Sequence, residues 1–326
     1  MKLFFLTCLL VCAVFASLFF GSVAISLKDM FLVFTGEGQS SLSTIVLNIR
    51  LPRSLLAMLV GAGVAASGAA IQGLFRNPLA DPALIGVSAG AALFAALFVV
   101  VGGGQGAAML GITGSGFLGG VLATFLVLFV GRRGGGLSTM LLAGIAINAI
   151  ALSGVGLLSY LSSDTQLRSI SFWALGSLNG AGWSSVSFAL VIPIAVYFIY
   201  REAPNLNVIT LGDEEAEYLG VSHTKLQLRI VLLCAVAVGI GVALTGVIAF
   251  LGLVVPHLIR MTLGSNHQTL IPASALLGGL LLLMADVLSR TLLAPAELPV
   301  GILTALVGGP FFIYLILYEQ KTRLAI

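Results

Sequence analysis

The chain has 326 residues, of which 59% are hydrophobic and only 8% are charged, with a formal net charge of +3. So few polar residues cannot cover the surface of a soluble domain, which excludes a soluble globular protein. Apolar runs of about 20 residues recur from end to end, which excludes a single membrane anchor. A transmembrane β-barrel would show short stretches of alternating polarity, and the sequence has none. The composition therefore predicts an all-α, polytopic membrane protein.

Hydropathy predicts about ten membrane-spanning helices, which we assign to one transmembrane domain covering residues 1–326. The first apolar run is longer than the core of a signal peptide and further spans follow it, so we interpret it as a retained helix. The eighth predicted span is interrupted by Pro256 and His257. The predicted spans are 3–26, 54–75, 84–101, 109–130, 138–160, 184–200, 229–248, 250–263, 271–292 and 300–318.

The distribution of basic residues predicts the orientation in the membrane. An even number of spans places both termini on one side, where they share a face with Arg132, Arg201 and the polar segment 203–225. The positive-inside rule makes this face cytoplasmic. Several arginines fall on the opposite face against the rule, which suggests that they have a function there. These are Arg50, Arg53, Arg168 and Arg290.

An internal repeat indicates a transporter. The segment Gly63–Gly68 (GVAASG) is similar to Gly241–Gly246 (GVALTG), and a proline follows fifteen residues after the first glycine in both, at Pro78 and Pro256. The two predicted helices start on opposite faces, so the repeat is inverted, as in many transporters. Chance similarity between two helices rich in glycine and alanine is the alternative.

The polar segment 203–225 contains four of the twelve acidic residues within five positions. Gly212 and Gly220 predict that it forms two short helices, which would present backbone ends and acidic side chains to a basic groove of a partner. A merely solvated loop is the alternative. The four acids are Asp213, Glu214, Glu215 and Glu217.

The chain lacks the residues of an enzyme or of an ion-coupled transporter. Asp286 and Arg290 are one helical turn apart and are predicted to pair with each other. No span carries a series of Asp, Glu and His residues for ion coupling, which disfavours the alternative of a secondary transporter. There is no phosphate-binding loop, so any ATP hydrolysis requires another polypeptide. We predict no catalytic residue, no metal site and no nucleic-acid partner. The three cysteines are predicted to be buried apolar residues. His257 is predicted to have a packing role, with a haem or metal contact as the alternative.

Several motifs follow one another along nearly the whole chain: Leu51–Arg53 (LPR), Gln72–Pro82 (QGLFRNPLADP) with Ile85–Ser88, Gly252–Arg260 (GLVVPHLIR), Ala285–Arg290 and Glu297–Gly301 (ELPVG). Together they resemble the FecCD-type family of ABC importer permeases for iron-siderophores, haem and vitamin B12. The resemblance implies a type II importer permease: a homodimer of ten-helix subunits in the bacterial inner membrane, with the path at the dimer axis. It also implies two copies of an ABC ATPase, which would bind ATP and Mg, and a periplasmic substrate-binding protein, with no cofactor on this chain.

The resemblance also implies roles for particular residues. Arg50, Arg53 and Arg290 match docking residues for acidic side chains of the binding protein, with contacts to lipid headgroups as the alternative. Ser138 and Thr139 resemble the cytoplasmic constriction, with Asn77 and Leu79 as a second layer, although Ser138 is equally suited to cap a helix. Residues that match the ATPase-coupling helices are Leu211, Gly212, Asp213, Glu214, Glu215, Ala216, Leu219 and Gly220.

The cargo is predicted from resemblance alone. The segment Phe172–Gly180 (FWALGSLNG) is more similar to the haem branch of the family than to the cobalamin branch. We therefore predict a haem importer, with a ferric siderophore or cobalamin as alternatives.

Overall fold

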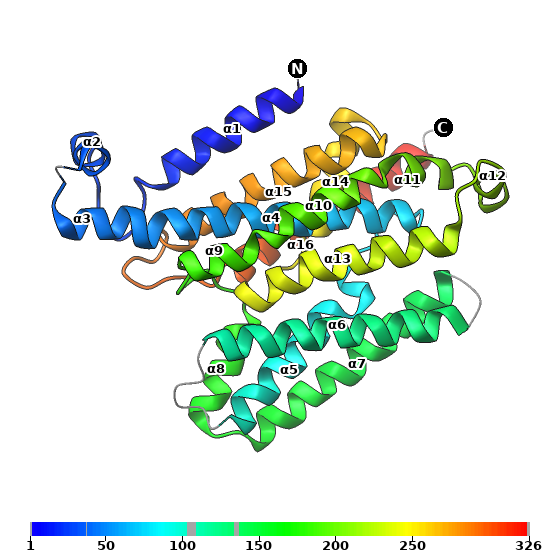
Figure 1. Cartoon of the computed structure of the whole chain (residues 1–326), viewed down its shortest axis with the longest axis horizontal. Coiled ribbons are helices and arrows are strands. Elements are labelled where there is room, and N and C mark those ends of the chain that lie inside the picture. Colours follow the sequence, from blue (N-terminus) through cyan, green and yellow to red (C-terminus); the bar gives the residue numbers. More distant parts are fainter. Residues whose placement is uncertain (1, 37, 103–108, 134–136, 325–326) are drawn as a thin grey trace.

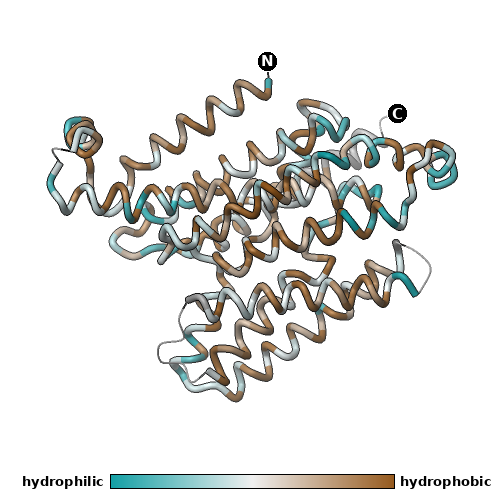
Figure 2. The backbone as a smooth tube through the Cα atoms, viewed as in Figure 1, coloured by the Kyte–Doolittle hydropathy of each residue, from teal (hydrophilic) through white to brown (hydrophobic). Residues whose placement is uncertain are grey.

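The computed structural model describes residues 2–36, 38–102, 109–133 and 137–324, and every regular element in these ranges is helical. Six helical segments are long and apolar enough to cross a membrane, and four shorter apolar helices bring the number to ten. Polar residues gather at the two ends of the bundle and apolar residues cover its length (Figure 2). The spans are α1 (Lys2–Ser17), α4 (Leu51–Leu74), α5 (Val87–Val101), α6 (Met109–Arg133), α7 (Leu137–Leu161), α9 with α10 (Trp183–Ala189, Val191–Arg201), α13 (His223–Thr245), α14 (Leu251–Leu263), α15 (His267–Ser289) and α16 (Val300–Leu324).

Helix α4 is the central helix of the bundle and is buried over most of its length. It packs against α10, α13, α14 and α15, while α5, α6 and α7 form a second group that contacts α13 (Figure 1). Glycine and alanine dominate the buried face of α4. Close packing through small residues is the usual way for helices to associate in lipid, where water supplies no hydrophobic drive between helices.

The inverted relation predicted from the repeat is present in the fold. Helices α4 and α13, which carry the two similar segments, pack against each other and run in opposite directions (Figure 1). Each is followed by a short turn and a helix that starts inside the bundle. After α4 this turn contains the 3-10 helix η2 (Pro82–Ile85) before α5, and after α13 it spans residues 246–250 before α14.

Helix α4 and the first turn of α14 meet at Gly252. Pro256 has no N–H, so the carbonyl of Gly252, four residues earlier, lacks its helical donor. The side chain of Gln72 replaces it: its Nε2 donates to Gly252 O at 3.3 Å and to Leu253 O at 3.2 Å. A side-chain amide from the first half of the repeat thus supplies the hydrogen-bond donor that Pro256 removes from the second half.

The contact at Gly252 also requires a glycine on α4. A Cβ at Gly68 would lie 1.9 Å from the backbone oxygen of Gly252, which cannot move without displacing α14. We expect Gly68→Ala to lower the thermal unfolding midpoint in detergent, at a cost of about 1–3 kcal/mol for overpacking. Gly114→Ala is the matched control, because Gly114 is also helical and has open space around its Cβ position. Equal midpoints for the two variants would contradict a tight α4–α14 contact.

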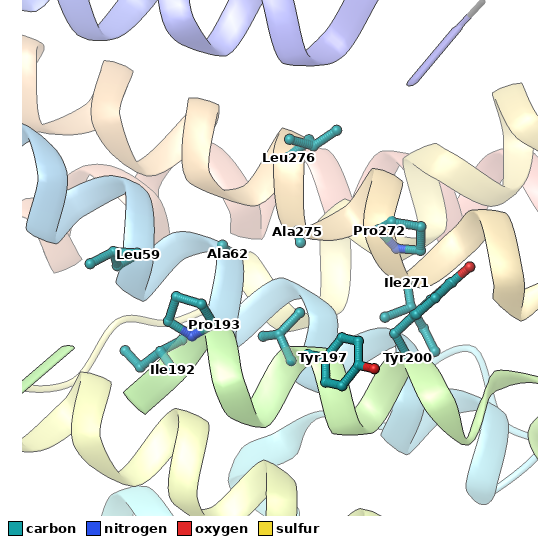
Figure 3. A pocket seen from close by; sticks show the side chains of 11 residues that line it. Leu59, Ala62, Ile192, Pro193, Tyr197, Tyr200, Ile271, Pro272, Ala275 and Leu276 are labelled. Carbon is teal, nitrogen blue, oxygen red and sulfur yellow. The ribbon is translucent and has the colours of Figure 1, made fainter. Parts of the chain in front are cut away.

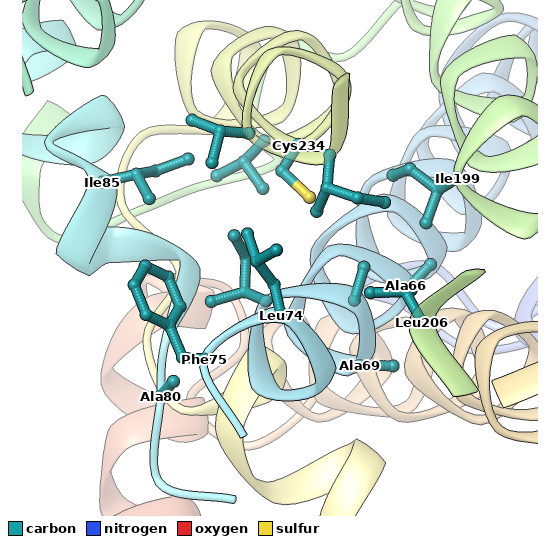
Figure 4. Close-up of a cluster of buried hydrophobic side chains, with 14 of the residues drawn as sticks. Ala66, Ala69, Leu74, Phe75, Ala80, Ile85, Ile199, Leu206 and Cys234 are labelled. Atoms are coloured by element: carbon teal, nitrogen blue, oxygen red, sulfur yellow. The ribbon is translucent and has the colours of Figure 1, made fainter. Parts of the chain in front are cut away.

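The largest hydrophobic core lies at the end of the bundle where α4 terminates (Figure 4). Leu74 and Phe75 from α4 meet Ile85 of η2, Cys234 of α13 and Leu206 from the segment that follows α10. Through Leu206, this core packs the polar segment 203–225 against the end of the central helix α4.

The structure corrects several boundaries. The first span ends at Ser17 and not at residue 26, because the chain turns at Gly21 and the Arg50 guanidinium donates to carbonyl oxygens in this turn. The region predicted as a connection over 27–53 contains α2 (Leu27–Thr35), α3 (Ser40–Thr44) and the π-helix η1 (Ile45–Arg50), and 161–183 contains α8 (Asp164–Ala174). Capping boxes begin α2 and α8, a local signal that hydropathy alone overlooks.

Two further expectations change. Cys234 is buried as predicted, whereas Cys8 and Cys12 are exposed on α1, since they face outward from the bundle. The sixth span is divided at Leu190 into α9 and α10.

On the outside of the bundle an apolar groove runs between α10 and α15, with α4 at its floor (Figure 3).

Candidate functional site

The polar segment forms two short helices, α11 (Ala203–Ile209) and α12 (Asp213–Tyr218), at one end of the bundle (Figure 1). The predicted breaks at Gly212 and Gly220 are confirmed. Gly212 caps α12 with φ 138° and Gly220 ends it with φ 81°, conformations that favour glycine. The C-terminus of α12 is a Schellman motif, with Gly220 N–H donating to Glu217 O at 2.9 Å and Val221 N–H to Ala216 O at 2.8 Å.

One side of this segment anchors it to the bundle. Leu206, Ile209 and Ala216 are fully buried in the largest core cluster. The other side is exposed, with Glu214 and Glu215 in the first turn of α12. Large apolar side chains are exposed beside these acids: Leu211 is 64%, Tyr218 91% and Leu219 61% exposed. Apolar and aromatic residues rimmed by acids are typical of a surface that binds another protein.

Asp213 is exposed as well, but its carboxylate has partners within the chain. It forms an ion pair with Arg76, and the His223 Nδ1 lies 3.3 Å from Asp213 Oδ1. Arg76 follows the end of α4 in the left-handed conformation, with φ 48°. The three residues therefore join α12 to the central helix α4 and to the start of α13. Sequence reasoning overlooked Arg76 and His223, because no local pattern relates them to Asp213.

A second group of charges lies at the opposite end of the bundle. Asp286 of α15 is fully buried and its Oδ1 accepts from Arg53 Nε at 2.8 Å. Arg53 Nη1 also donates to both oxygens of Glu297, at 3.0 and 2.9 Å. The predicted pair is present, with Arg290 Nη2 at 3.1 Å from Asp286 Oδ2, although its geometry is not that of a hydrogen bond. These contacts join α4, α15 and the segment before α16.

The three arginines predicted to dock a binding protein are buried, with exposed fractions of 4% for Arg50, 6% for Arg53 and 5% for Arg290. Arg50 donates to Leu18 O at 2.7 Å and to Val23 O at 2.5 Å, which closes the turn after α1. Their position at the end opposite α12 agrees with the predicted topology. Direct docking stays a prediction, and reversing their charges would disrupt these internal contacts.

The predicted gate residues lie at the α12 end. Asn77 and Leu79 are exposed in the turn between α4 and η2, where Asn77 Oδ1 accepts from Leu79 N–H at 2.9 Å. Ser138 is exposed and Thr139 half-buried in the first turn of α7. Their role in a constriction stays a prediction.

The described part of the chain contains no group of three or more His, Cys, Asp or Glu side chains arranged to hold a metal ion. His257 lies half-buried in α14. His257 has an interaction partner inside the protein.

Comparison with known proteins decides the family. Residues 9–318 match the model of the FecCD transport family. The chain belongs to this family. It is 46% identical to the hemin transport system permease protein HmuU of Yersinia pestis over 324 residues, which cover 98% of this chain and 96% of that protein.

Other members of the family are also similar over most of the chain. The cobalamin import system permease protein BtuC of Halobacterium salinarum is 38% identical over 282 residues, covering 86% of this chain and 74% of that protein. A solved structure, described as a metal-chelate type ABC transporter in an inward-facing conformation, superimposes with a TM-score of 0.88 at 34% identity, covering 97% and 99% of the two chains. The type II importer permease fold predicted from the resemblance is therefore confirmed for this FecCD protein.

Proposed function

We propose that this FecCD protein is the permease subunit of an ATP-driven importer that moves haem from the periplasm to the cytoplasm of a bacterium. The subunit acts as a homodimer in the inner membrane, with both termini cytoplasmic. Two copies of an ABC ATPase bind at the α12 end and a periplasmic binding protein binds at the opposite end. ATP and Mg belong to the ATPase, and the permease needs no cofactor of its own.

The observation that carries this proposal is the match to a hemin permease over nearly the whole of both chains. The exposed surface of α11 and α12 supports the position of the ATPase, because acidic and apolar side chains are presented together there while the opposite side of the segment is anchored in the core. A ferric siderophore or cobalamin is the alternative cargo, and the similarity to a cobalamin permease favours the second of these.

The gate and docking roles are parts of the same proposal. Ser138 and Thr139, with Asn77 and Leu79, form the constriction at the cytoplasmic end of the path. Arg53 and Arg290 support the docking face through Asp286 and Glu297, and Arg50 supports it through the turn after α1. Their burial favours a role in shaping this face over direct contact with the binding protein.

A secondary transporter is the competing function. It would need a buried ionisable group that binds or relays an ion. Asp286 is fully buried, and both of its carboxylate oxygens face arginines within 3.1 Å. Because both arginines neutralise its charge, the Asp286 carboxylate is poorly suited to bind or relay a coupling ion.

The test is reconstitution of the permease in vesicles with its cognate ATPase and binding protein. We expect haem bound to the binding protein to stimulate ATP hydrolysis and uptake, whereas a ferric siderophore and cobalamin do neither. Stimulation by cobalamin or a siderophore alone would overturn the haem assignment and keep the importer. Failure to assemble with any ATPase, together with uptake driven by an ion gradient, would overturn the importer itself.

A further inference from the structure

The groove between α10 and α15 lies on the outside of the membrane-spanning part of the protein and has a volume of about 410 Å³. Its floor is formed by Leu59 and Ala62 of α4, and Figure 3 shows the two helices on either side. The lining is apolar apart from two tyrosine hydroxyl groups. The walls include Pro193, Tyr197 and Tyr200 on α10 and Pro272 and Ala275 on α15.

The side chain of Arg201 places a positive charge at the end of this groove. Arg201, the last residue of α10, directly follows Tyr200 and is exposed. Its Nη1 donates to the hydroxyl oxygen of Tyr197 at 3.3 Å, so a residue that lines the groove also orients the guanidinium. Among the described residues, no carboxylate lies within ion-pair distance of Arg201.

The neighbouring acid is engaged elsewhere. Glu202 Oε1 accepts from Arg229 Nη1 at 3.1 Å, and its Oε2 accepts from Asn205 Nδ2 at 2.6 Å. Glu202 therefore forms no ion pair with Arg201, and its electrostatic effect on this guanidinium is the smallest of those that act on it. An arginine and two tyrosines at the end of a membrane-spanning helix mark the level of the lipid headgroups.

We propose that this groove is a binding site for an anionic phospholipid. An acyl chain lies in the apolar groove over Ala62 and Ala275, and the phosphate of the headgroup binds Arg201. The charge is what selects the ligand, because any lipid could fill an apolar groove, whereas an uncompensated cation at the headgroup level favours an anionic lipid. The site uses no residue of α11, of α12 or of the charge group at the other end, so it does not depend on the cargo or on the transport mechanism.

The experiment is native mass spectrometry of the purified full-length protein, incubated with phosphatidylglycerol or with phosphatidylcholine of the same acyl chains. We expect wild-type protein to retain phosphatidylglycerol preferentially. Arg201→Gln should weaken retention of phosphatidylglycerol about five-fold, the effect of one basic residue near a membrane surface, and leave phosphatidylcholine unchanged. Ala275→Phe, which fills the groove, should lower retention of both lipids.

Two matched controls distinguish this site from the general surface. Arg132→Gln removes an exposed arginine at the end of α6, and Ala16→Phe adds the same ring at an exposed position of α1. Both should behave as wild type. Tyr197→Phe keeps the groove volume and removes the hydroxyl that orients Arg201, so it should weaken phosphatidylglycerol retention about two-fold even if Ala275→Phe does not fold.

Three results would overturn the proposal. The first is equal retention of the two lipids by wild-type protein. The second is an Arg201→Gln variant that loses no more phosphatidylglycerol than Arg132→Gln. The third is a groove closed by a second copy of the chain, seen as a protein–protein complex that Ala275→Phe dissociates while lipid retention is unchanged.

Discussion

Asp286→Ala is expected to destabilise the protein by about 3–5 kcal/mol, because it leaves buried arginines without their counter-charge. Asp286 is fully buried between Arg53 at 2.8 Å and Arg290 at 3.1 Å. Of the two arginines, Arg53 keeps Glu297, which is partly exposed, whereas Arg290 loses the carboxylate with which it pairs. The measurement is the free energy of unfolding of the purified protein in mixed micelles, titrated with a denaturing detergent.

Asp164→Ala is the control for this variant. Asp164 is exposed in the first turn of α8, where a carboxylate contributes at most about 1 kcal/mol through the helix dipole. Asp286→Asn, which keeps the shape but not the charge, should fall between the two. If Asp286→Ala costs no more than Asp164→Ala, the buried charges are not mutually neutralised and the ion-pair group does not stabilise this end of the bundle.

The double variant Glu214→Lys with Glu215→Lys is expected to weaken assembly with the ATPase by more than about tenfold, since like charges facing each other across an interface cost several kcal/mol. Both side chains are exposed in the first turn of α12, away from the core that anchors the segment. The unfolding midpoint should therefore change little. The measurement is co-purification with the ATPase, followed by uptake into vesicles.

Asp164→Lys serves as the matched control, because it reverses an exposed charge in the first helical turn at the opposite end of the bundle. Assembly should be unchanged for this control, and the loss for the double variant should diminish as salt is raised. Wild-type levels of both ATPase binding and transport in the double variant would show that α12 is not the coupling surface.

Some of the candidate site could be predicted from local patterns. Gly212 and Gly220 predicted two short helices, because glycine readily adopts the positive φ that ends them. The Asp286–Arg290 pair followed from the four-residue spacing of a helix turn. By contrast, the burial of Arg50 and Arg53 was not predicted, since Arg53 contacts Asp286, 233 residues further along the chain, and Arg50 contacts the turn after α1.

The sequence by itself determined the class of the protein, its ten spans, its family and the position of the polar segment. These depend on hydropathy, turn residues and ordered motifs, which are local properties of the chain. Only the tertiary structure decided that Gln72 donates to the carbonyl of Gly252, that Arg76 binds Asp213, and that Tyr197 holds Arg201 at the end of a groove. Each of these depends on which helices are neighbours, and in an apolar chain the packing of small residues decides this without leaving a distinctive local pattern.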